Sequence, residues 1–502
     1  MKIFLKVNWE WIFKNIKMKK LVRLLLVITV LGVSCQSDNK TLKSKPNPIN
    51  NKSEKIEELI KSYEENKGFS GSVLVVENSK VIYKGGIGLA NKELEVPNDP
   101  LTKHRIGSLT KQFTAMLILQ LVEKNKIELD ATINKYIPDY PRAGGDKITI
   151  HHLLTHSSGI PRFSLEKYRD PYTPDELLAL WDDSGLDFEP GKQFTYSNPG
   201  YFLLGVIIER VTKKTYEQVL HEQILDPLGM KNSGYDRHST ILMNRSSGYV
   251  KQGTVYENAG YTDMTVSYAA GAMYSTIEDM FLWDQALYSD KILSSKYRDL
   301  LFKSHLFGLG RFYGYGCFNS KYPVGSTKDS INVIEHSGGI QGYSARITRI
   351  STNKNLIIIL SNVQGTETKP LTYAIMGILY DKPYEFPKKS FADALFSKIS
   401  ENGVKAGVTF FKEHQTSGEY NIKEREMNSL GYDFLESEKL DTAMEIFKMN
   451  TTIFPESSNA FDSLGEVYVL KGNKEKAIES YEKSVFLDPN NMNAIKKLKE
   501  LK

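Results

Sequence analysis

Two stretches near the carboxyl end of this 502-residue chain match each other at a constant spacing of 34 residues. Leu430 and Gly431 in the first stretch correspond to Leu464 and Gly465 in the second. At the same spacing lie four further matches: Phe434 with Tyr468, Ala443 with Ala477, Phe447 with Tyr481, and Pro455 with Pro489. Small and aromatic residues at helical spacing, ended by a proline, are typical of a helix-turn-helix unit that cannot bury its apolar face alone. The spacing therefore restricts residues 427–502 to a stack of helices.

The repeated pattern resembles two tetratricopeptide repeats, and the charged segment from Met492 to Lys502 predicts a helix that caps the stack. Residues 388–426 carry apolar residues at helical spacing with Gly403 and Gly418 as breaks, and predict connecting helices. Two functions remain open for this all-helical end: a groove for a protein or peptide partner, or a packing and spacing module. Two repeats and a cap offer little concave surface, which favours the packing module.

Length, charge and cysteine content exclude several classes of protein. At about 150 residues per domain, a chain of 502 residues is expected to contain about three units. Its 65 Lys and Arg residues against 60 Asp and Glu residues give a net charge of only +5, so we expect no nucleic-acid partner. Its two cysteines, Cys35 and Cys317, form no CxxC pair and no disulfide framework, which excludes a redox or structural zinc site. Cys317 is expected to be a buried, small apolar residue rather than a nucleophile.

The first 35 residues predict an export signal. Basic residues without a neighbouring acid precede a 10-residue, mainly apolar run from Leu24 to Val33. A membrane-spanning helix needs about 20 apolar residues, whereas the apolar core of a signal peptide needs about 7–15. The run therefore fits a secretion signal, with an uncleaved anchor as the alternative.

Residues 18–35 resemble a bacterial lipoprotein signal, although Leu31 lies one place further from Cys35 than usual. The resemblance implies that Cys35 is lipidated and becomes the first residue of an exported chain tethered to the cell envelope. Met18 opens a signal of ordinary length, which indicates that translation starts there. Residues 36–56 are mostly polar, contain no aromatic residue and include two prolines, so they predict a flexible tether.

Between residues 57 and 383, segments typical of strands and of helices are mixed irregularly, which predicts an α+β domain. The pattern predicts a hairpin at residues 70–86, a long apolar helix at residues 112–124 and a buried strand at residues 355–360. All motifs that suggest chemistry lie in this domain.

Ser108 and Lys111 form the first of these motifs, Ser-x-x-Lys, at the start of the predicted helix. Residues three apart share a helix face, so the Lys111 amine can lie beside the Ser108 hydroxyl. The amino end of a helix favours negative charge that develops on an attacking oxygen or an oxyanion. A serine needs a neighbouring base of this kind to become a nucleophile. Alone, the motif is short enough to occur by chance, so it requires support from other residues.

Tyr196 and Asn198 form the second motif, Tyr-x-Asn. A tyrosine can act as a general base when nearby cations lower its pKa from the usual value of about 10. Asn198 can orient Lys111 or donate a hydrogen bond to a substrate carbonyl.

His336, Gly338 and Gly339 form the third motif, His-x-Gly-Gly, directly after an apolar segment. Small residues at the end of a strand let a substrate backbone lie along the strand edge. His336 can hydrogen-bond into such a site, although a single histidine at a strand end is more often structural.

In this order, Ser-x-x-Lys, Tyr-x-Asn and His-x-Gly-Gly, the chain resembles the serine β-lactamase and penicillin-binding-protein superfamily, most closely its class C-like, esterase-type branch. The resemblance covers residues 57–381 and extends over four longer stretches: HRIGSLTKQFTA, ITIHHLLTHSSGIP, FEPGKQFTYSNPGY and AAGAMYSTIEDMFLW. It implies a fold of the β-lactamase and transpeptidase type over residues 57–383, with an antiparallel sheet flanked by helices and a helical subdomain. The all-α repeats follow.

The resemblance implies a serine hydrolase that works through an acyl-enzyme and needs no cofactor. Ser108 is the expected nucleophile, and Lys111 and Tyr196 are expected to share the role of general base. The oxyanion hole is expected to consist of the backbone N–H of Ser108 and that of one residue within 339–341. Four residues are expected to contact the substrate: Asn198, His336, Gly338 and Gly339.

His336 stands where the family usually has a lysine, which holds the carboxylate of a β-lactam or of a D-alanyl peptide. A histidine has an unperturbed pKa of about 6.5 and is mostly neutral at pH 7, so carboxylate binding is expected to be weaker there. The expected activity is therefore that of an esterase, amidase or peptidase on a small-molecule or peptide substrate. The alternatives are a β-lactamase or D-alanyl-D-alanine carboxypeptidase and, from another class, a non-catalytic binding or scaffold protein.

His152 and His156 are four residues apart, which is the spacing of two metal ligands on a helix. The sequence offers no third ligand, and the family resemblance places this stretch in a structural helix near the site. We therefore expect no metal.

Replacing the predicted lipid-bearing residue, Cys35→Ala, is expected to release the protein from the membrane fraction, because the thiol that would carry the lipid is gone. Cell fractionation followed by immunoblotting measures this. Cys317→Ala is the control, since it removes the other cysteine and keeps the signal. Unchanged membrane association of Cys35→Ala would instead favour an uncleaved anchor.

Overall fold

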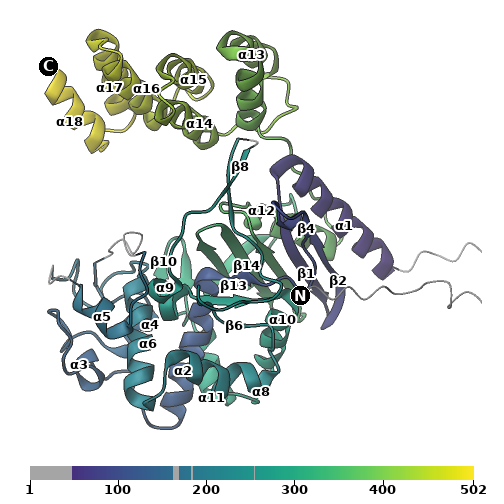
Figure 1. The fold of residues 1–502 in the computed structure, drawn as a ribbon, viewed down its shortest axis with the longest axis vertical. Coiled ribbons are helices and arrows are strands. Elements are labelled where there is room, and N and C mark those ends of the chain that lie inside the picture. Colours follow the sequence, from purple (N-terminus) through teal and green to yellow (C-terminus); the bar gives the residue numbers. More distant parts are fainter. Residues whose placement is uncertain (1–47, 162–168, 182–184, 254) are drawn as a thin grey trace, which may run out of the picture. The chain divides into compact units, whose positions relative to one another are not determined.

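The central element of the fold is an eight-stranded sheet in which every pair of neighbouring strands is antiparallel. The structure, a computed structural model, describes residues 48–161, 169–181, 185–253 and 255–502 (Figure 1). The strands lie in the order β10-β11-β12-β13-β14-β15-β1-β2. Their bounds are Gly71–Glu77 (β1), Lys80–Ile87 (β2), Leu306–Gly308 (β10), Arg311–Tyr313 (β11), Phe318–Pro323 (β12), Ser330–Ile340 (β13), Tyr343–Ile350 (β14) and Asn355–Ser361 (β15).

The predicted hairpin at residues 70–86 is confirmed as β1 and β2. The two strands are joined through Asn78 and Ser79, whose φ angles are 50° and 66°. Positive φ at both central residues suits a two-residue turn, because its twist then matches that of the flanking strands.

Alternate side chains of β15 enter two separate cores, because successive residues of a strand point to opposite faces of a sheet. Leu356, Ile358 and Leu360 join the core on the side of the helical subdomain, whereas Ile357 and Ile359 join the core on the opposite face. Every residue of β15 is buried. The buried strand predicted at residues 355–360 is therefore confirmed.

Helices α1 (Pro48–Lys67) and α12 (Thr368–Leu379) cover one face of the sheet (Figure 1). Ile56, Leu59, Ile60 and Tyr63 of α1 are spaced along one helix face and are buried there. The prediction of a flexible tether over residues 36–56 is therefore wrong for residues 48–56, which are helical. The physical reason is that α1 is anchored by its buried face, and its polar first turns continue from that anchor.

A helical subdomain covers the other face of the sheet, and its core is shared with β1, β14 and β15. Its central helix α2 is buried on nearly all sides, which explains why its sequence is apolar all round. On this side the helices are α2 (Thr110–Glu123), α3 (Ile133–Tyr136), α4 (Ile150–Leu154), α5 (Pro174–Ala179), α6 (Asn198–Thr212), α7 (Tyr216–Leu220), α8 (Asp226–Leu228), α9 (Met264–Gly271), α10 (Ile277–Ala286) and α11 (Ser295–Phe302), with a 3-10 turn, η2 (Gly107–Leu109), and a π-helical turn, η4 (His221–Leu225).

Seven short strands of the described residues form three smaller sheets. One of them, the sheet of β5, β9 and β6, holds the segment before Ser108 beside the segment after α9. The Ile106 N–H donates to the Met273 carbonyl at 3.0 Å within this region. The short strands are β3 (Leu89–Asn91), β4 (Val96–Pro97), β5 (His104–Arg105), β6 (Gly234–Tyr235), β7 (Tyr249–Gln252), β8 (Val255–Asn258) and β9 (Met273–Ser275).

The carboxyl end of the chain is entirely helical, as predicted. The first helix, α13, contains the predicted break at Gly403, where φ is 80° and ψ is 167°. No helix of the described residues is both long and apolar enough to cross a membrane. The helices of this region are α13 (Phe391–His414), α14 (Glu424–Glu436), α15 (Leu440–Ile453), α16 (Ser458–Leu470), α17 (Lys474–Leu487) and α18 (Met492–Leu501).

The 34-residue spacing reflects a contact between a glycine and an aromatic ring that occurs in both repeated stretches. A Cβ atom on Gly431 of α14 would lie 2.4 Å from a ring carbon of Phe447, and a Cβ atom on Gly465 of α16 would lie 2.9 Å from a ring carbon of Tyr481. Each glycine therefore lets the aromatic ring of the following helix lie against its backbone. The stack of helices is confirmed, while its assignment as tetratricopeptide repeats stays a prediction.

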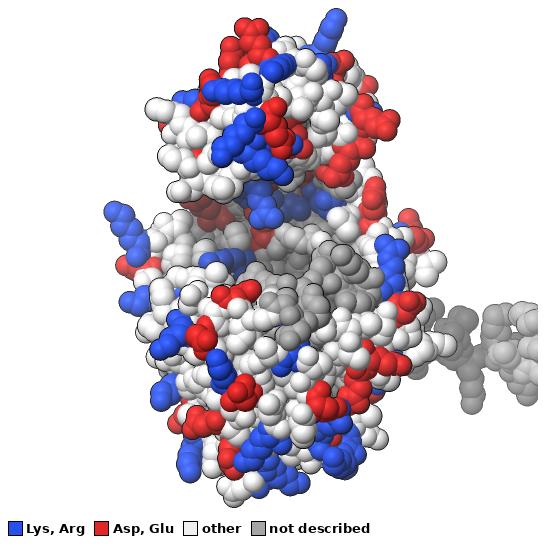
Figure 2. Space-filling model, turned by 90° about the vertical axis from the view of Figure 1, so that its left-hand side faces the viewer, with Lys and Arg blue, Asp and Glu red and all other residues white. Residues whose placement is uncertain are grey.

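Charged side chains of both signs are interspersed over the face of the molecule in Figure 2. No stripe of basic residues is visible among the described residues of that face, in keeping with the small net charge of +5. Such a surface provides no extended attraction for a polyanion.

Candidate active site

Ser108 lies where the sheet and the helical subdomain meet, in the 3-10 turn η2 that leads into α2. The preceding residue, Gly107, has a φ of 52°, and a Cβ atom there would lie 2.9 Å from the backbone nitrogen of Gly339. Only glycine combines this backbone conformation with such a close approach. Gly107 therefore brings the Ser108 turn directly against strand β13.

Lys111 lies in the first turn of α2, and its side chain is fully buried. Its Nζ atom donates to three oxygens: Ser108 Oγ at 3.1 Å, Asn198 Oδ1 at 2.9 Å and the Ala270 carbonyl at 2.8 Å. The last two are carbonyl oxygens, which can only accept hydrogen bonds. These two carbonyls hold two of the three N–H groups of the ammonium, and the third N–H points at Ser108.

Burial lowers the pKa of Lys111 to about 7, because the ammonium loses its hydration. The three oxygens around the amine are neutral, so none of them holds the proton as a carboxylate would. A lysine in this environment exchanges its proton near neutral pH, and its neutral form carries a lone pair.

The Ala270 carbonyl reaches Lys111 because α9 is kinked at Tyr268, where φ is 40° and ψ is −134°. A residue other than glycine held in a sparsely populated region of this kind costs on the order of 1–3 kcal/mol. The kink turns two carbonyls toward α2. Thr114 Oγ1 donates to the Ala269 carbonyl at 2.7 Å, and Lys111 Nζ donates to the Ala270 carbonyl. The Tyr268 side chain is buried among other aromatic rings, which holds the kink in place.

Tyr196 and Asn198 flank Ser197, the residue that caps the amino end of α6. Ser197 is the N-cap of this helix, and its hydroxyl accepts from the Gly200 N–H at 3.2 Å. The cap fixes Asn198 at the first helical position, from which its side chain reaches Lys111. The centroid of the Tyr196 ring lies 5.0 Å from Lys111 Nζ. The first and second motifs therefore meet at one lysine.

His336 lies on β13, but it does not line the cavity in front of Ser108. Only 2% of its surface is exposed, and its Nδ1 and Nε2 atoms lie 2.6 Å from the Ser337 carbonyl and 3.4 Å from the Tyr313 hydroxyl. Burial, followed by the positive charge of Lys111, lowers the pKa of His336 to about 3, so its ring is neutral at pH 7. The structure thus places His336 behind the cavity wall, against aromatic rings, and not in the position of direct substrate contact that we expected.

Strand β13 has an open edge beside Ser108. On one side, β12 pairs with β13 only as far as the pair Phe318 and Glu335, whereas β14 pairs with it on the other side up to Ile340. Residues 336–340 therefore have no strand partner on the β12 side within the described part of the chain. A Cβ atom on Gly338 would lie 1.9 Å from the Ile106 carbonyl oxygen, so glycine is needed there for the serine segment to lie against β13.

The register of β13 and β14 indicates which backbone group faces the open edge. A two-residue turn joins the strands, so the closing pair, Ile340 with Tyr343, exchanges hydrogen bonds, and such pairs alternate along the ladder. Gly338 is then bonded to β14, whereas the N–H of Gly339 points to the opposite side, toward Ser108. Of the residues 339–341 that we expected to contain the second N–H donor of the oxyanion hole, the register thus favours Gly339.

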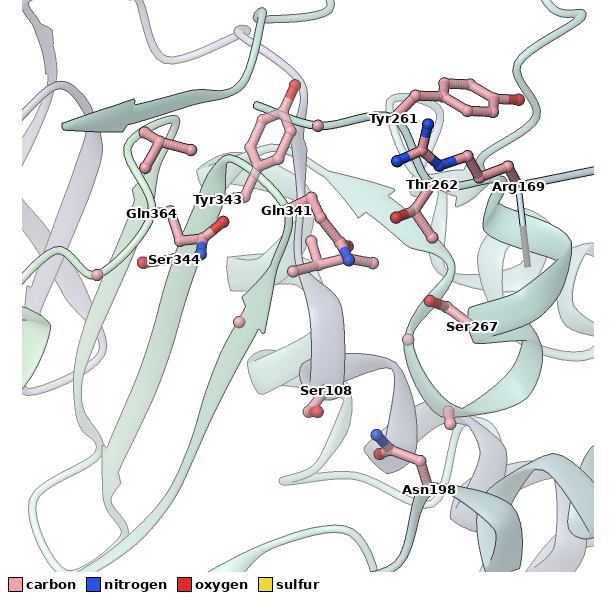
Figure 3. A pocket seen from close by; sticks show the side chains of 17 residues that line it. Ser108, Arg169, Asn198, Tyr261, Thr262, Ser267, Gln341, Tyr343, Ser344 and Gln364 are labelled. Atoms are coloured by element: carbon pink, nitrogen blue, oxygen red, sulfur yellow. The ribbon is translucent and has the colours of Figure 1, made fainter. Parts of the chain in front are cut away.

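A cavity of about 820 Å³ opens in front of these groups (Figure 3). Ser108, Asn198 and Gly339 line its catalytic side. The opposite walls come from the segment before α9, from the hairpin between β13 and β14, and from the loop after β15. The Gly342 N–H of this hairpin donates to Gln364 Oε1 at 3.0 Å, which ties the hairpin to the loop after β15.

The histidines singled out by their spacing have structural roles. His156 is buried, its Nδ1 accepts from the Ser197 N–H at 3.0 Å, and its ring centroid lies 4.3 Å from that of Tyr196. His156 therefore supports the turn that carries the second motif, a contribution that the sequence did not predict. His152 completes the cap of α4, where its Nδ1 accepts from the Thr149 N–H at 3.2 Å. Over the described residues, no group of three or more His, Cys, Asp or Glu side chains is placed to hold a metal.

Cys317, the cysteine that the described part of the chain contains, is not a reactive thiol. Cys317 is buried, its thiol donates to the Leu301 carbonyl at 3.1 Å, and burial raises its pKa to about 12. A thiol in this state is not a nucleophile at neutral pH. The predicted lipidation residue, Cys35, lies outside the described residues.

Comparisons with known proteins agree with this fold. The protein-family model described as Beta-lactamase matches residues 56–378. The putative penicillin-binding protein PbpX of Bacillus subtilis is 28% identical over 323 residues, which cover 62% of this chain and 77% of that protein. Penicillin-binding protein 4* of the same organism is 27% identical over 395 residues, which cover 72% of this chain and 86% of that protein.

Among solved structures, the octameric penicillin-binding protein homologue from Pyrococcus abyssi is similar, with a TM-score of 0.58 and 29% identity. The likeness covers 69% of this chain and 81% of that one. All three motifs lie within the residues that the family model matches, and α13–α18 lie outside them. The match covers well over half of the chain, and the protein therefore belongs to the beta-lactamase family.

Proposed function

We propose that this protein is a serine hydrolase that attacks an ester or amide through Ser108 and forms an acyl-enzyme. The observation that carries the proposal is the 3.1 Å contact between Ser108 Oγ and the Nζ atom of a buried lysine. A purely structural lysine gains stability from staying charged, whereas this amine has its pKa lowered to about 7 by burial. An amine that is about half neutral at physiological pH is suited to remove a proton.

Lys111 acts as the general base in the first step. In its neutral form, two N–H groups stay on Asn198 Oδ1 and the Ala270 carbonyl, and the lone pair faces Ser108. The Ser108 hydroxyl then donates its proton to Nζ while Oγ attacks the carbonyl carbon of the substrate. The resulting ammonium keeps its hydrogen bonds to both carbonyl oxygens, which are already in place to stabilise its positive charge.

The backbone N–H groups of Ser108 and Gly339 bind the oxyanion of the tetrahedral intermediate. The position of Ser108 at the amino end of α2 adds the favourable end of the helix dipole. A donor of this kind is worth about 10²–10³-fold in rate in serine hydrolases. The open edge of β13 holds the backbone of the substrate as an added strand.

Tyr196 passes the proton to the leaving group. Its ring centroid lies 5.0 Å from Lys111 Nζ, so Tyr196 belongs to the same group of side chains. The bond between the carbonyl carbon and the leaving group breaks, and the proton taken from Ser108 moves through Lys111 and Tyr196 to the leaving atom. A water molecule then gives its proton to Lys111 and attacks the acyl-enzyme, which releases the acid and returns the proton to Ser108.

The state of His336 supports ester, amide or peptide substrates over β-lactams. Its ring is buried and neutral, so β13 presents no fixed cation for a carboxylate beside the scissile bond. A β-lactamase or D-alanyl-D-alanine carboxypeptidase is the alternative within the same chemistry. A binding or scaffold protein is the alternative of another class, and the contact between Ser108 and Lys111 opposes it.

We also propose that the protein is exported and tethered through Cys35, and that residues 427–502 form two tetratricopeptide repeats and a capping helix. The basic and apolar pattern of residues 18–35 supports the first statement, although these residues lie outside the described part of the chain. The glycine and ring contact repeated at 34 residues supports the second.

Removing the nucleophile, Ser108→Ala, is expected to abolish labelling by a fluorophosphonate probe and to lower kcat/KM for p-nitrophenyl butyrate by at least about 10³-fold. Gel fluorescence and initial rates measure the two effects. Ser267→Ala is the matched control, because Ser267 lines the same cavity without contacting Lys111. Labelling that persists in Ser108→Ala would contradict the assignment of the nucleophile, and a wild-type protein that takes no label would favour the scaffold alternative.

Activity is expected to rise with pH through about 7, the value to which burial lowers the pKa of Lys111. The sign follows from the role of the residue, because the ammonium form that dominates below this pH cannot accept the Ser108 proton. Lys111→Arg, whose guanidinium stays charged, is expected to lower kcat/KM by at least about 10²-fold at every pH. Rates of p-nitrophenyl butyrate hydrolysis from acid to alkaline pH, with circular dichroism to check folding, test this. A flat wild-type profile would show that Lys111 is not the base.

The neutral His336 predicts that p-nitrophenyl acetate and butyrate are hydrolysed readily, whereas the chromogenic β-lactam nitrocefin is cleaved slowly or not at all. The comparison of kcat/KM for the three compounds measures this preference, with Ser108→Ala as the background for each. Rapid cleavage of nitrocefin that depends on Ser108 would assign the protein to the β-lactamase alternative.

A further inference from the structure

Arg169 is the only residue with a formal charge among the 17 described residues that line the cavity. The other lining side chains are amides, hydroxyls and apolar groups. Lys111 lies below the cavity wall and is not one of the lining residues. The charge that a bound molecule meets in this cavity is therefore positive.

In Figure 3, Arg169 lies beside Tyr261 and Thr262, and its guanidinium points toward the middle of the cavity. Ser108 and Asn198 lie together in another part of the same cavity. A substrate whose carbonyl is at Ser108 thus meets Arg169 with a part of the molecule that is removed from the reacting bond.

Within the described part of the chain, Arg169 forms no salt bridge with a carboxylate. The neighbouring Asp170 is exposed and does not line the cavity. Asp263, the acid closest in sequence to the Tyr261 and Thr262 segment, already accepts from the Tyr261 hydroxyl and from the Thr265 N–H, both at 2.9 Å. The Arg169 guanidinium is therefore available to a ligand.

Among the described residues, the other cations near the cavity are paired with a carboxylate or neutral. Arg105 and Arg245 both pair with the buried Asp236. His336, at the strand position where the family usually has a lysine, is buried and uncharged at neutral pH. Strand β13 thus offers no cation to an anion, and Arg169 is the charged group that the described lining of the cavity provides.

We propose that this cavity takes acyl donors that carry a carboxylate several bonds away from the scissile carbonyl, and that Arg169 binds this carboxylate. A guanidinium offers paired N–H donors that match the two oxygens of a carboxylate. Neutral hydrogen bonds to the rest of the acyl donor come from the side-chain amides of Gln341 and Gln364 and from the hydroxyls of Tyr261 and Thr262. The inference rests on the proposed attack by Ser108, and it makes Arg169 a specificity-determining residue.

The first test compares mono-p-nitrophenyl glutarate with p-nitrophenyl butyrate, which share a leaving group and differ mainly in the terminal charge. Arg169→Gln is expected to lower kcat/KM for the glutarate ester by about fivefold, the size of an exposed ion pair, and to leave that for butyrate within about twofold. The loss is expected in KM rather than kcat, because the contact is equally strong in the ground state and the transition state. Arg169→Lys keeps the charge and is expected to retain part of the preference.

Two controls separate a specific contact from the general charge of the protein. Lys231→Gln removes an exposed cation that does not line the cavity. This variant is expected to leave kcat/KM unchanged for both esters. Raising the salt concentration is expected to weaken the wild-type preference for the glutarate ester and to leave Arg169→Gln unaffected, because a partly exposed ion pair is screened. An equal loss for both esters in Arg169→Gln would overturn the inference.

A second measurement does not require turnover. In ligand-observed NMR titrations, Ser108→Ala protein is expected to bind mono-p-nitrophenyl glutarate about fivefold more tightly than does the double variant Ser108→Ala and Arg169→Gln. Equal binding by the two proteins would overturn the role of Arg169, even if the wild-type enzyme hydrolyses butyrate. A wild-type protein that hydrolyses no ester, with binding still dependent on Arg169, would overturn only the proposed hydrolase function.

Discussion

A lysine amine held inside the protein without a carboxylate partner is the constraint on which the rest of the site depends. A fully charged amine in that position is costly, because it loses its hydration and gains no opposite charge. The protein surrounds it with two carbonyl oxygens and one hydroxyl, and burial lowers its pKa to about 7. Of the three oxygens that Lys111 contacts, only the hydroxyl of Ser108 can give up a proton. The environment of the lysine thus defines the reactive atom.

Several irregular features of the backbone serve this arrangement. The strained conformation of Tyr268 directs the Ala270 carbonyl to the amine, and the positive φ of Gly107 brings the serine turn against β13. Both features lie at the junction of the sheet and the helical subdomain. The sheet contributes a strand edge and backbone donors, while the subdomain contributes the side chains that move protons. Neither half holds a complete site, which explains why the cavity lies between them.

The sequence was informative where chemistry is carried by side-chain type and spacing. The three-residue spacing of Ser108 and Lys111, the fold class and the helical carboxyl end all follow from patterns along the chain, and the structure agrees with them. Contributions from the backbone were not predictable, because a carbonyl such as that of Ala270 leaves no sequence signal. The burial of His336 and the exposure of Arg169 depend on tertiary packing and loop course, which residue types do not encode locally. The start of α1 was missed because its first turns are polar and are stabilised by burial further along the helix.

The open edge of β13 also bears on strand pairing between molecules. Unpaired strand edges are templates on which strands of other molecules add, and proteins commonly shorten or cover them. In the described part of this chain the unpaired stretch of β13 is limited to residues 336–340, contains two glycines and ends in a tight turn. An edge much longer than this would invite intermolecular sheets, and an edge closed by an extended β12 would leave no room for a ligand. The position of Phe318, where β12 begins, therefore determines how much of the β13 edge is unpaired and accessible to a ligand.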